Sequence, residues 1–180
     1  MRLSLGSNIS HCDLKSFQMS EIVFDGTVKF CERFVDRFSR TTDQMVQAAR
    51  SGRQNIAEGS QVSGTSKKTE LKLVSVARGS LEELLLDYED FLRQRELKRW
   101  EKDSKEALFV RKLGKQEDRA YSTYKPYLET RSAEVCANIL IHQANYLLDQ
   151  QLKALETDFL EEGGFTERLY NSRRRKRGDG

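Results

Sequence analysis

The chain has 180 residues, of which 37% are hydrophobic and 33% are charged, enough for one domain with a hydrophobic core. The single proline argues against a β-rich fold, and the three cysteines, none of them in a Cys-x-x-Cys pair, argue against a disulfide or zinc scaffold. No apolar run approaches 20 residues, which argues against a membrane span. Within a net charge of +3, basic residues outnumber acidic ones by ten to six in 93–119 and by six to two in 166–180. We therefore expect a soluble, cytoplasmic, all-α protein with local positive potential.

The N-terminal third of the chain predicts a leader followed by two helices. Residues 1–19 are rich in small and polar side chains and are predicted to be disordered. Apolar residues then recur at spacings of three and four over 20–38, which is typical of a helix with one buried face. A second helix is predicted to start at Thr42, which can cap it, and to end where Gly59 and Gly64 occur.

The third predicted helix has the most regular pattern, and Thr65 or Ser66 can cap it. Its spacing of three and four residues forms a heptad seam made of Leu71, Val74, Arg78, Leu81, Leu85, Tyr88 and Leu92. Arg78 interrupts this seam, and a buried arginine needs a carboxylate or carbonyl partner, for which Glu58 and Glu82 are candidates. We interpret Arg78 as a structural or subunit-interface residue.

Residues 93–130 form a less regular segment, which we call the inserted segment. The pattern predicts one or two short amphipathic helices anchored by Trp100 and ending at Gly114. A loop containing Pro126 is expected after them, because proline disfavours a helix interior.

The last long helix is predicted over 132–160, with His142 and Tyr146 on its apolar face. Gly163 and Gly164 are expected to stop it. Four long amphipathic helices predict a four-helix bundle over 20–165, with the inserted segment between its third and fourth helices. Residues 166–180 then form a basic C-terminal tail.

Two stretches carry a resemblance to a known family. QMVQAARSGRQNIAEGS (44–60) and VARGSLEEL (76–84) resemble bacterial four-helix-bundle proteins encoded in intervening sequences of large-subunit ribosomal RNA genes. That family also includes the accessory variability protein of diversity-generating retroelements, and residues 20–175 are similar to its longer "suffix" subgroup. The resemblance implies an antiparallel up-down bundle, a ring-like homopentamer and nucleic-acid binding through positively charged surface. It implies no catalytic residues.

The strongest candidate site is a run of five basic residues, which we call the basic run: Arg173, Arg174, Arg175, Lys176 and Arg177. Each cation can neutralise a phosphate and release condensed counterions, and arginine can bind a phosphate with two hydrogen bonds. The alternative is a solubilising tail without a specific partner. Arg50 and Arg53, one helical turn apart, are a second candidate for phosphate contact, or else part of an ordinary solvated face.

Three residues of the shared motif are interpreted as structural. Asn55 and Glu58 are expected to fix the helix end before Gly59, or to contact a neighbouring subunit.

His142 is interpreted as a satisfied core or rim histidine, because the Glu-x-x-His pairs of di-iron bundles are absent. The sequence has no P-loop, GxGxxG, GxSxG or HExxH motif, so no catalytic residue, cofactor or metal ligand is predicted.

Two functions are compatible with these features. The first is a non-enzymatic accessory factor that binds RNA or DNA with weak specificity through its basic residues. The second is an oligomeric adaptor or structural protein, in which the inserted segment around Trp100 recruits a protein partner.

Overall fold

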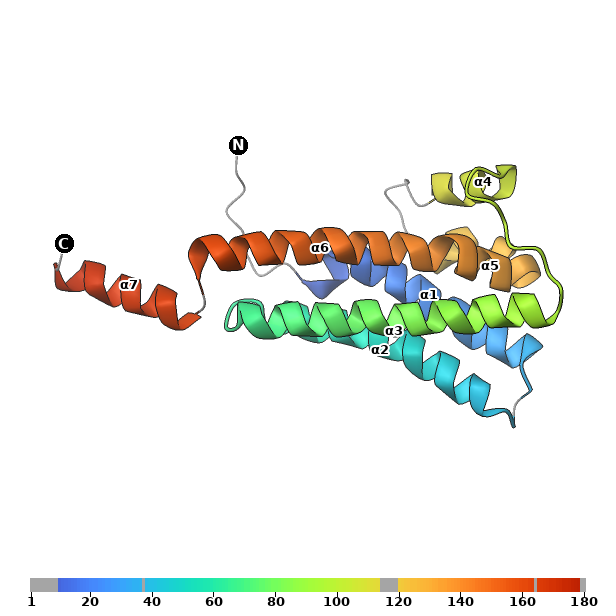
Figure 1. The fold of residues 1–180 in the computed structure, drawn as a ribbon, viewed down its shortest axis with the longest axis horizontal. Helices are drawn as coiled ribbons and strands as arrows, with labels where there is room; N and C mark the ends of the chain where they lie inside the picture. The colour runs from blue at the N-terminus through green and yellow to red at the C-terminus, as the bar shows by residue number, and fades with distance from the viewer. Residues whose placement is uncertain (1–9, 37, 114–119, 164, 179–180) are drawn as a thin grey trace.

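The computed structural model describes residues 10–36, 38–113, 120–163 and 165–178, and these ranges contain helices and no strands (Figure 1). The predicted all-α class is confirmed. Helices of 20 or more residues in this described part are α1 (Lys15–Phe34), α2 (Arg40–Val62), α3 (Lys67–Gln94) and α6 (Ile141–Glu162). Shorter elements are η1 (His11–Asp13), α4 (Lys105–Leu113), α5 (Tyr121–Val135), the π turn η2 (Cys136–Leu140) and α7 (Phe165–Arg177).

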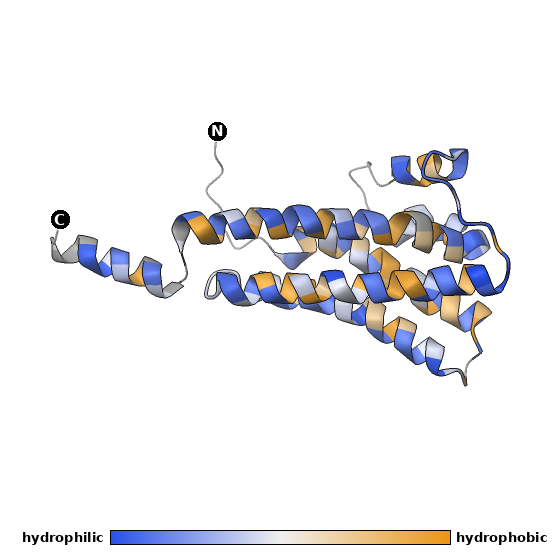
Figure 2. Ribbon diagram, in the orientation of Figure 1, coloured by the Kyte–Doolittle hydropathy of each residue, from blue (hydrophilic) through white to orange (hydrophobic). Residues whose placement is uncertain are grey.

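The four long helices pack around one shared core. Helix α1 contacts α2 and α6, and α3 contacts the same two helices, so each long helix has two long neighbours. In Figure 1, α2 and α3 lie side by side, joined by a short turn, while α6 runs along α3. Hydrophobic and hydrophilic residues alternate along these helices (Figure 2), which gives each one a face for the core and a face for solvent.

Large apolar side chains fill the core with almost no exposure, among them Met19, Ile22, Phe30, Met45, Ile56, Leu81, Leu84 and Ile139. One polar pair is buried with them. The Tyr88 hydroxyl donates a hydrogen bond of 3.0 Å to Thr27 Oγ1, and Thr27 Oγ1 donates to the Val23 carbonyl. Because both hydroxyls find a partner, their burial carries little of the cost of an unsatisfied polar group.

Serine side chains cap two of the long helices. Ser66 Oγ accepts from the Thr69 amide at 3.3 Å at the start of α3, so Ser66 is the cap of the two that the sequence allowed, Thr65 or Ser66. Helix α2 begins earlier than predicted, because Ser39 Oγ accepts from the Thr41 amide at 3.2 Å. Thr42 is therefore an interior residue of the first turn, and its proposed capping role is wrong.

The fold also begins earlier than the sequence pattern indicated. Helix α1 starts at Lys15, and Ser16, Phe17 and Met19 are buried. The predicted disordered leader 1–19 is therefore wrong for its last five residues. Phe17 and Met19 supply apolar surface that extends the buried face of α1 by one turn.

Pro126 lies inside α5, where the sequence predicted a loop. Proline lacks the N–H that would bond to the carbonyl four residues earlier, which normally disfavours this position. Here the neighbouring side chains Tyr124 and Leu128 are buried, and Leu128 packs beside Gly26 of α1. Tertiary packing thus stabilises a helix that local propensity opposes. Gly114, the predicted end of the preceding helix, lies outside the described residues.

The fourth long helix is part of a longer helical path than predicted. Helix α5, which is kinked at Arg131, continues through η2 into α6. Gly163 ends α6 with a positive φ of 71°, which confirms its predicted role as a stop and favours glycine at this position. Gly164 lies outside the described residues. In the described part, no helix combines the length and apolarity needed to cross a membrane.

Candidate functional site

Helix α7 carries the basic run on an element set apart from the four long helices. Figure 1 shows α7 extending beyond the end of α6, near the C-terminus of the chain. The basic run occupies the last five residues of this helix, and Arg173 and Arg174 are exposed. Because an α-helix has about 3.6 residues per turn, the adjacent side chains of Arg173 and Arg174 point in different directions from its axis. The predicted tail is therefore helical up to Arg177, whose backbone the structure describes.

Arg50 and Arg53 differ in their surroundings. Arg50 is exposed, whereas Arg53 is half-buried, with its Cζ atom 4.2 Å from the centroid of the Phe24 ring. A cation over an aromatic face is attracted by the ring quadrupole. The guanidinium of Arg53 thus contributes to packing between α1 and α2, which leaves Arg50 as the more accessible cation of this pair.

Arg78 joins α3 to α6 at the edge of the core. Its Nη1 donates to Glu82 Oε2 at 2.5 Å, and its Nε donates to Asp149 Oδ1 at 3.1 Å. Asn145, which is buried, donates to the same Glu82 oxygen at 3.2 Å. The predicted partner Glu82 is therefore right, Glu58 is not a recorded partner, and Asp149 is an additional partner that sequence spacing did not indicate.

The motif residues Asn55, Glu58 and Gly59 lie within α2 rather than at its end, so their proposed role in fixing the helix end is wrong. The Asn55 amide donates to the Ser51 carbonyl at 2.8 Å, one turn earlier in the same helix. Gly59 is buried against Val74 of α3, and Glu58 is exposed. Gly59 thus lies at the contact between α2 and α3, where a Cβ atom would be at an ordinary distance of 3.5 Å from Val74 Cγ2, and α2 continues to Val62.

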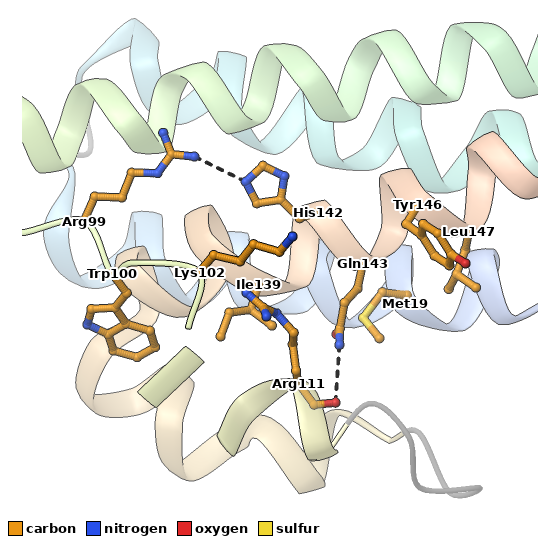
Figure 3. A pocket seen from close by; sticks show the side chains of 10 residues that line it. All are labelled: Met19, Arg99, Trp100, Lys102, Arg111, Ile139, His142, Gln143, Tyr146 and Leu147. Atoms are coloured by element: carbon orange, nitrogen blue, oxygen red, sulfur yellow. Dashed lines mark hydrogen bonds between the residues drawn. The ribbon is translucent and has the colours of Figure 1, made fainter. Parts of the chain in front are cut away.

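A pocket of about 680 Å³ lies where the inserted segment folds back over α6 (Figure 3). We call it the Trp100 pocket. Its apolar and aromatic walls consist of Met19, Trp100, Ile139, Tyr146 and Leu147. Its polar lining consists of Arg99, Lys102, Arg111, His142 and Gln143. The chain from α3 to α4, α4 itself, α1, η2 and α6 all contribute, so the site exists only in the folded protein.

His142 is at the rim of this pocket and forms a contact with Arg99. The distance from Arg99 Nη2 to His142 Nε2 is 3.4 Å, and a guanidinium can only donate hydrogen bonds. Nε2 must therefore act as the acceptor, which requires a neutral imidazole with its proton on Nδ1. Burial and then the positive charge of Arg99 lower the pKa of His142, in agreement with this neutral state.

The two other cations of the pocket differ from Arg99. Arg99 Nη1 is 2.6 Å from Glu89 Oε1, so its charge is partly neutralised. Among the residues that the structure describes, Lys102 and Arg111 have no carboxylate within ion-pair distance. Within the described ranges, the Trp100 pocket therefore has two cations without an ion-pair partner beside an apolar wall.

Sequence reasoning identified parts of this site but not their assembly. It noted the excess of positive charge in 93–119 and the anchoring position of Trp100. The apolar face predicted for the last helix included His142 and Tyr146, but both are exposed, and Tyr146 is 63% accessible. Of the two positions expected for His142, core or rim, the structure has the rim. A histidine and a tyrosine at core spacing do not indicate that the inserted segment forms a pocket beside them.

In the described part of the chain, no group of three or more His, Cys, Asp or Glu side chains could hold a metal ion. No protein-family model matches the chain. No curated protein and no solved structure is significantly similar to it.

Proposed function

We propose that this protein is a non-enzymatic accessory factor that binds RNA or DNA with weak sequence specificity, and that α7 is its main phosphate-contacting element. The basic run on a helix set apart from the four long helices is the observation that carries this proposal. A polyanion can reach the exposed side chains of Arg173 and Arg174 on this helix. Contacts from arginine and lysine to phosphate give affinity and register but little sequence information.

The architecture and assembly form part of the same proposal. The observed packing of α1, α2, α3 and α6 fits an antiparallel up-down four-helix bundle with the inserted segment between its third and fourth helices. The motifs at 44–60 and 76–84 support membership of the intervening-sequence family. We further propose a cytoplasmic location and a homo-oligomer, with the ring-like pentamer of that family as the specific assembly.

The proposal is tested by measuring binding of a labelled single-stranded RNA, and of the DNA of the same sequence, by fluorescence anisotropy. In the test variant, all five residues of the basic run are replaced by glutamine. The matched control makes the same change in net charge at five exposed lysines elsewhere: Lys15, Lys68, Lys72, Lys105 and Lys153. We expect the test variant to bind at least about tenfold more weakly than the control. Equal affinity of the two variants would contradict a specific role for α7.

A second candidate function is an oligomeric adaptor, favoured by apolar side chains around the junction of α6 and α7. Leu160 is 83% exposed and Tyr170 is 65% exposed. Such side chains favour contact with another chain, whether a second copy or a protein partner. Light scattering of the wild type and of a Leu160→Ser, Tyr170→Ser variant tests this role. A smaller assembly in the variant would support it, and a monomeric wild type would exclude self-association.

A further inference from the structure

We propose that the Trp100 pocket binds a nucleotide, with the base against the aromatic wall and the phosphate between Lys102 and Arg111. The nucleotide is either a free mononucleotide or one unit of a single strand, because both present the same base and phosphate. This site is separate from the basic run. The inference therefore goes beyond the proposed role of α7 and does not depend on it.

The size and the lining of the pocket suit a small ligand with an apolar part. A volume of about 680 Å³ lies within the range of roughly 300–1,000 Å³ that is usual for small-molecule sites. Met19 and Ile139 are almost fully buried and form apolar parts of the wall, and Leu147 packs beside them partly buried. Covering this wall removes apolar surface from water, which favours a ligand with a hydrophobic face.

Planar side chains in the lining favour an aromatic ligand over an aliphatic one. Trp100, His142 and Tyr146 each present a ring to the pocket, and Arg99 adds a planar guanidinium (Figure 3). Nucleic-acid bases stack on such rings and on the planes of arginine guanidinium groups. A neutral His142 adds a stacking surface without adding charge at the base.

The charge of the pocket favours a phosphate at one end. Lys102 and Arg111 lack a carboxylate partner among the described residues, and Figure 3 shows both side chains at the pocket together with His142. A neighbouring hollow of about 540 Å³ provides a contrast, because its three carboxylates offset its three cations: Glu101, Glu106 and Glu134 against Lys98, Arg99 and Arg131. An anion is therefore attracted to the Trp100 pocket rather than to the hollow beside it.

Gln143 supplies a further polar group. Its Nε2 donates to the Arg111 carbonyl at 3.5 Å, and its Oε1 is buried without a hydrogen-bond partner in the described part of the molecule. An unsatisfied buried acceptor is unfavourable and is uncommon in folded proteins. An exocyclic amine on a base is a donor of the kind that this oxygen lacks, so adenine is a suitable first base to test.

The test uses Trp100, the only tryptophan of the chain, as its reporter. Adenosine 5′-monophosphate is titrated into the full-length protein while tryptophan fluorescence is recorded. We expect a saturable change in fluorescence. We expect about tenfold weaker binding for each of Lys102→Ala and Arg111→Ala, because each removes one charge-assisted contact to the phosphate. Adenosine, which lacks the phosphate, is expected to bind the wild type more weakly than the monophosphate.

Lys153→Ala is the matched control, because Lys153 is an exposed lysine on α6 outside the pocket lining. It should bind the nucleotide like the wild type. Circular dichroism spectra verify that all variants keep the wild-type helix content, and a pocket variant that loses helix is replaced by Lys102→Gln or Arg111→Gln. No saturable response to the monophosphate or to oligoadenylate would overturn the proposal. A response to laurate but to neither nucleotide ligand would also overturn it, in favour of an aliphatic anion.

Two further measurements distinguish a free mononucleotide from a unit of a strand, and binding at the Trp100 pocket from binding at the basic run. A response to the mononucleotide supports a free ligand, whereas a response only to single-stranded oligoadenylate supports a unit of a strand. With all five residues of the basic run changed to glutamine, we expect the mononucleotide response of Trp100 to persist. In that variant, loss of strand binding with a retained mononucleotide response would support both sites. In the wild type, strand binding without any Trp100 response would contradict the pocket and leave the proposed role of α7 standing.

Discussion

Arg78 of α3 donates a hydrogen bond of 3.1 Å from Nε to Asp149 Oδ1 of α6. The same guanidinium donates to Glu82, which also accepts from the buried Asn145. One arginine thus organises polar groups from two helices at the edge of an apolar core. Because α6 also carries His142 and other residues of the Trp100 pocket, this contact helps to hold one wall of the pocket against α3.

Arg78→Ala is expected to lower the free energy of unfolding by about 1–2 kcal/mol, because it removes two charge-assisted hydrogen bonds at a half-buried position. Urea unfolding followed by circular dichroism measures this change. Arg93→Ala is the matched control. Arg93 pairs with Asp90 within α3 at an exposed position, so its loss is expected to cost under about 0.5 kcal/mol. An equal cost for the two variants would contradict a structural role for Arg78.

Gly52 and Gly79 are both helical glycines with opposite surroundings. A Cβ atom at Gly52 would lie 2.7 Å from Leu81 Cδ2, whereas a Cβ atom at Gly79 meets nothing within 4 Å. We expect Gly52→Ala to destabilise the protein by about 1–3 kcal/mol through overpacking between α2 and α3. Gly79→Ala should instead stabilise it by about 0.5–1 kcal/mol, because alanine favours a helix. Thermal and urea unfolding of both variants measure the difference, and the same sign for both would contradict this packing.

The pKa of His142 is expected to lie below the ordinary value of about 6.5. Burial is the largest cause and Arg99 the second, while Glu89 and Glu82 act in the opposite direction and Arg111 lowers the pKa further. An NMR titration of the imidazole measures it, with His142→Gln used to assign the signal. Arg99→Ala should raise the pKa only part of the way, since the effect of burial persists. A wild-type value above 6.5 would contradict the geometry.

The lowered pKa of His142 makes the free energy of unfolding depend on pH. As the pH falls below about 6.5, the unfolded chain takes up a proton at His142 before the folded protein does. The contribution of His142 to stability is therefore complete above that pH and decreases as the pH falls through the pKa of the folded state. The difference in unfolding free energy between wild type and His142→Gln, measured from neutral to acidic pH, should follow this trend. A constant difference would contradict it.

The three cysteines are expected to differ in reactivity. Cys12 is exposed, whereas burial raises the pKa of Cys31 to about 11 and that of Cys136 to about 12. Because the thiolate is the reactive form, a thiol reagent should modify Cys12 rapidly and the two buried cysteines only after unfolding. Counting modified thiols in the native protein and in denaturant tests this. Rapid reaction of all three in the native protein would contradict the placement of α1 and η2.

Local signals predicted several elements correctly. Ser66 is one of the two residues whose side chain the sequence allows to cap α3, and the stop predicted at Gly163 is confirmed by its positive φ, which glycine tolerates. Periodicity located most of the buried faces of the long helices. These features depend on residues within a few positions of one another, which a sequence displays directly.

Tertiary features could not be predicted in the same way. Pro126 indicated a loop, yet packing of its neighbours against α1 stabilises a helix there. Asp149 was missed as a partner of Arg78 because the two are 71 positions apart in the chain. The Trp100 pocket depends on how the inserted segment crosses α6, which no periodic pattern encodes.

The most direct test of nucleic-acid binding by α7 is the salt dependence of that binding. The logarithm of the affinity for a single strand falls with the logarithm of salt concentration by about 0.7 per phosphate neutralised. Replacing the five residues of the basic run with glutamine should therefore flatten this slope by up to about 3.5 units. An unchanged slope in that variant, or wild-type binding that salt does not affect, would contradict phosphate contact by α7.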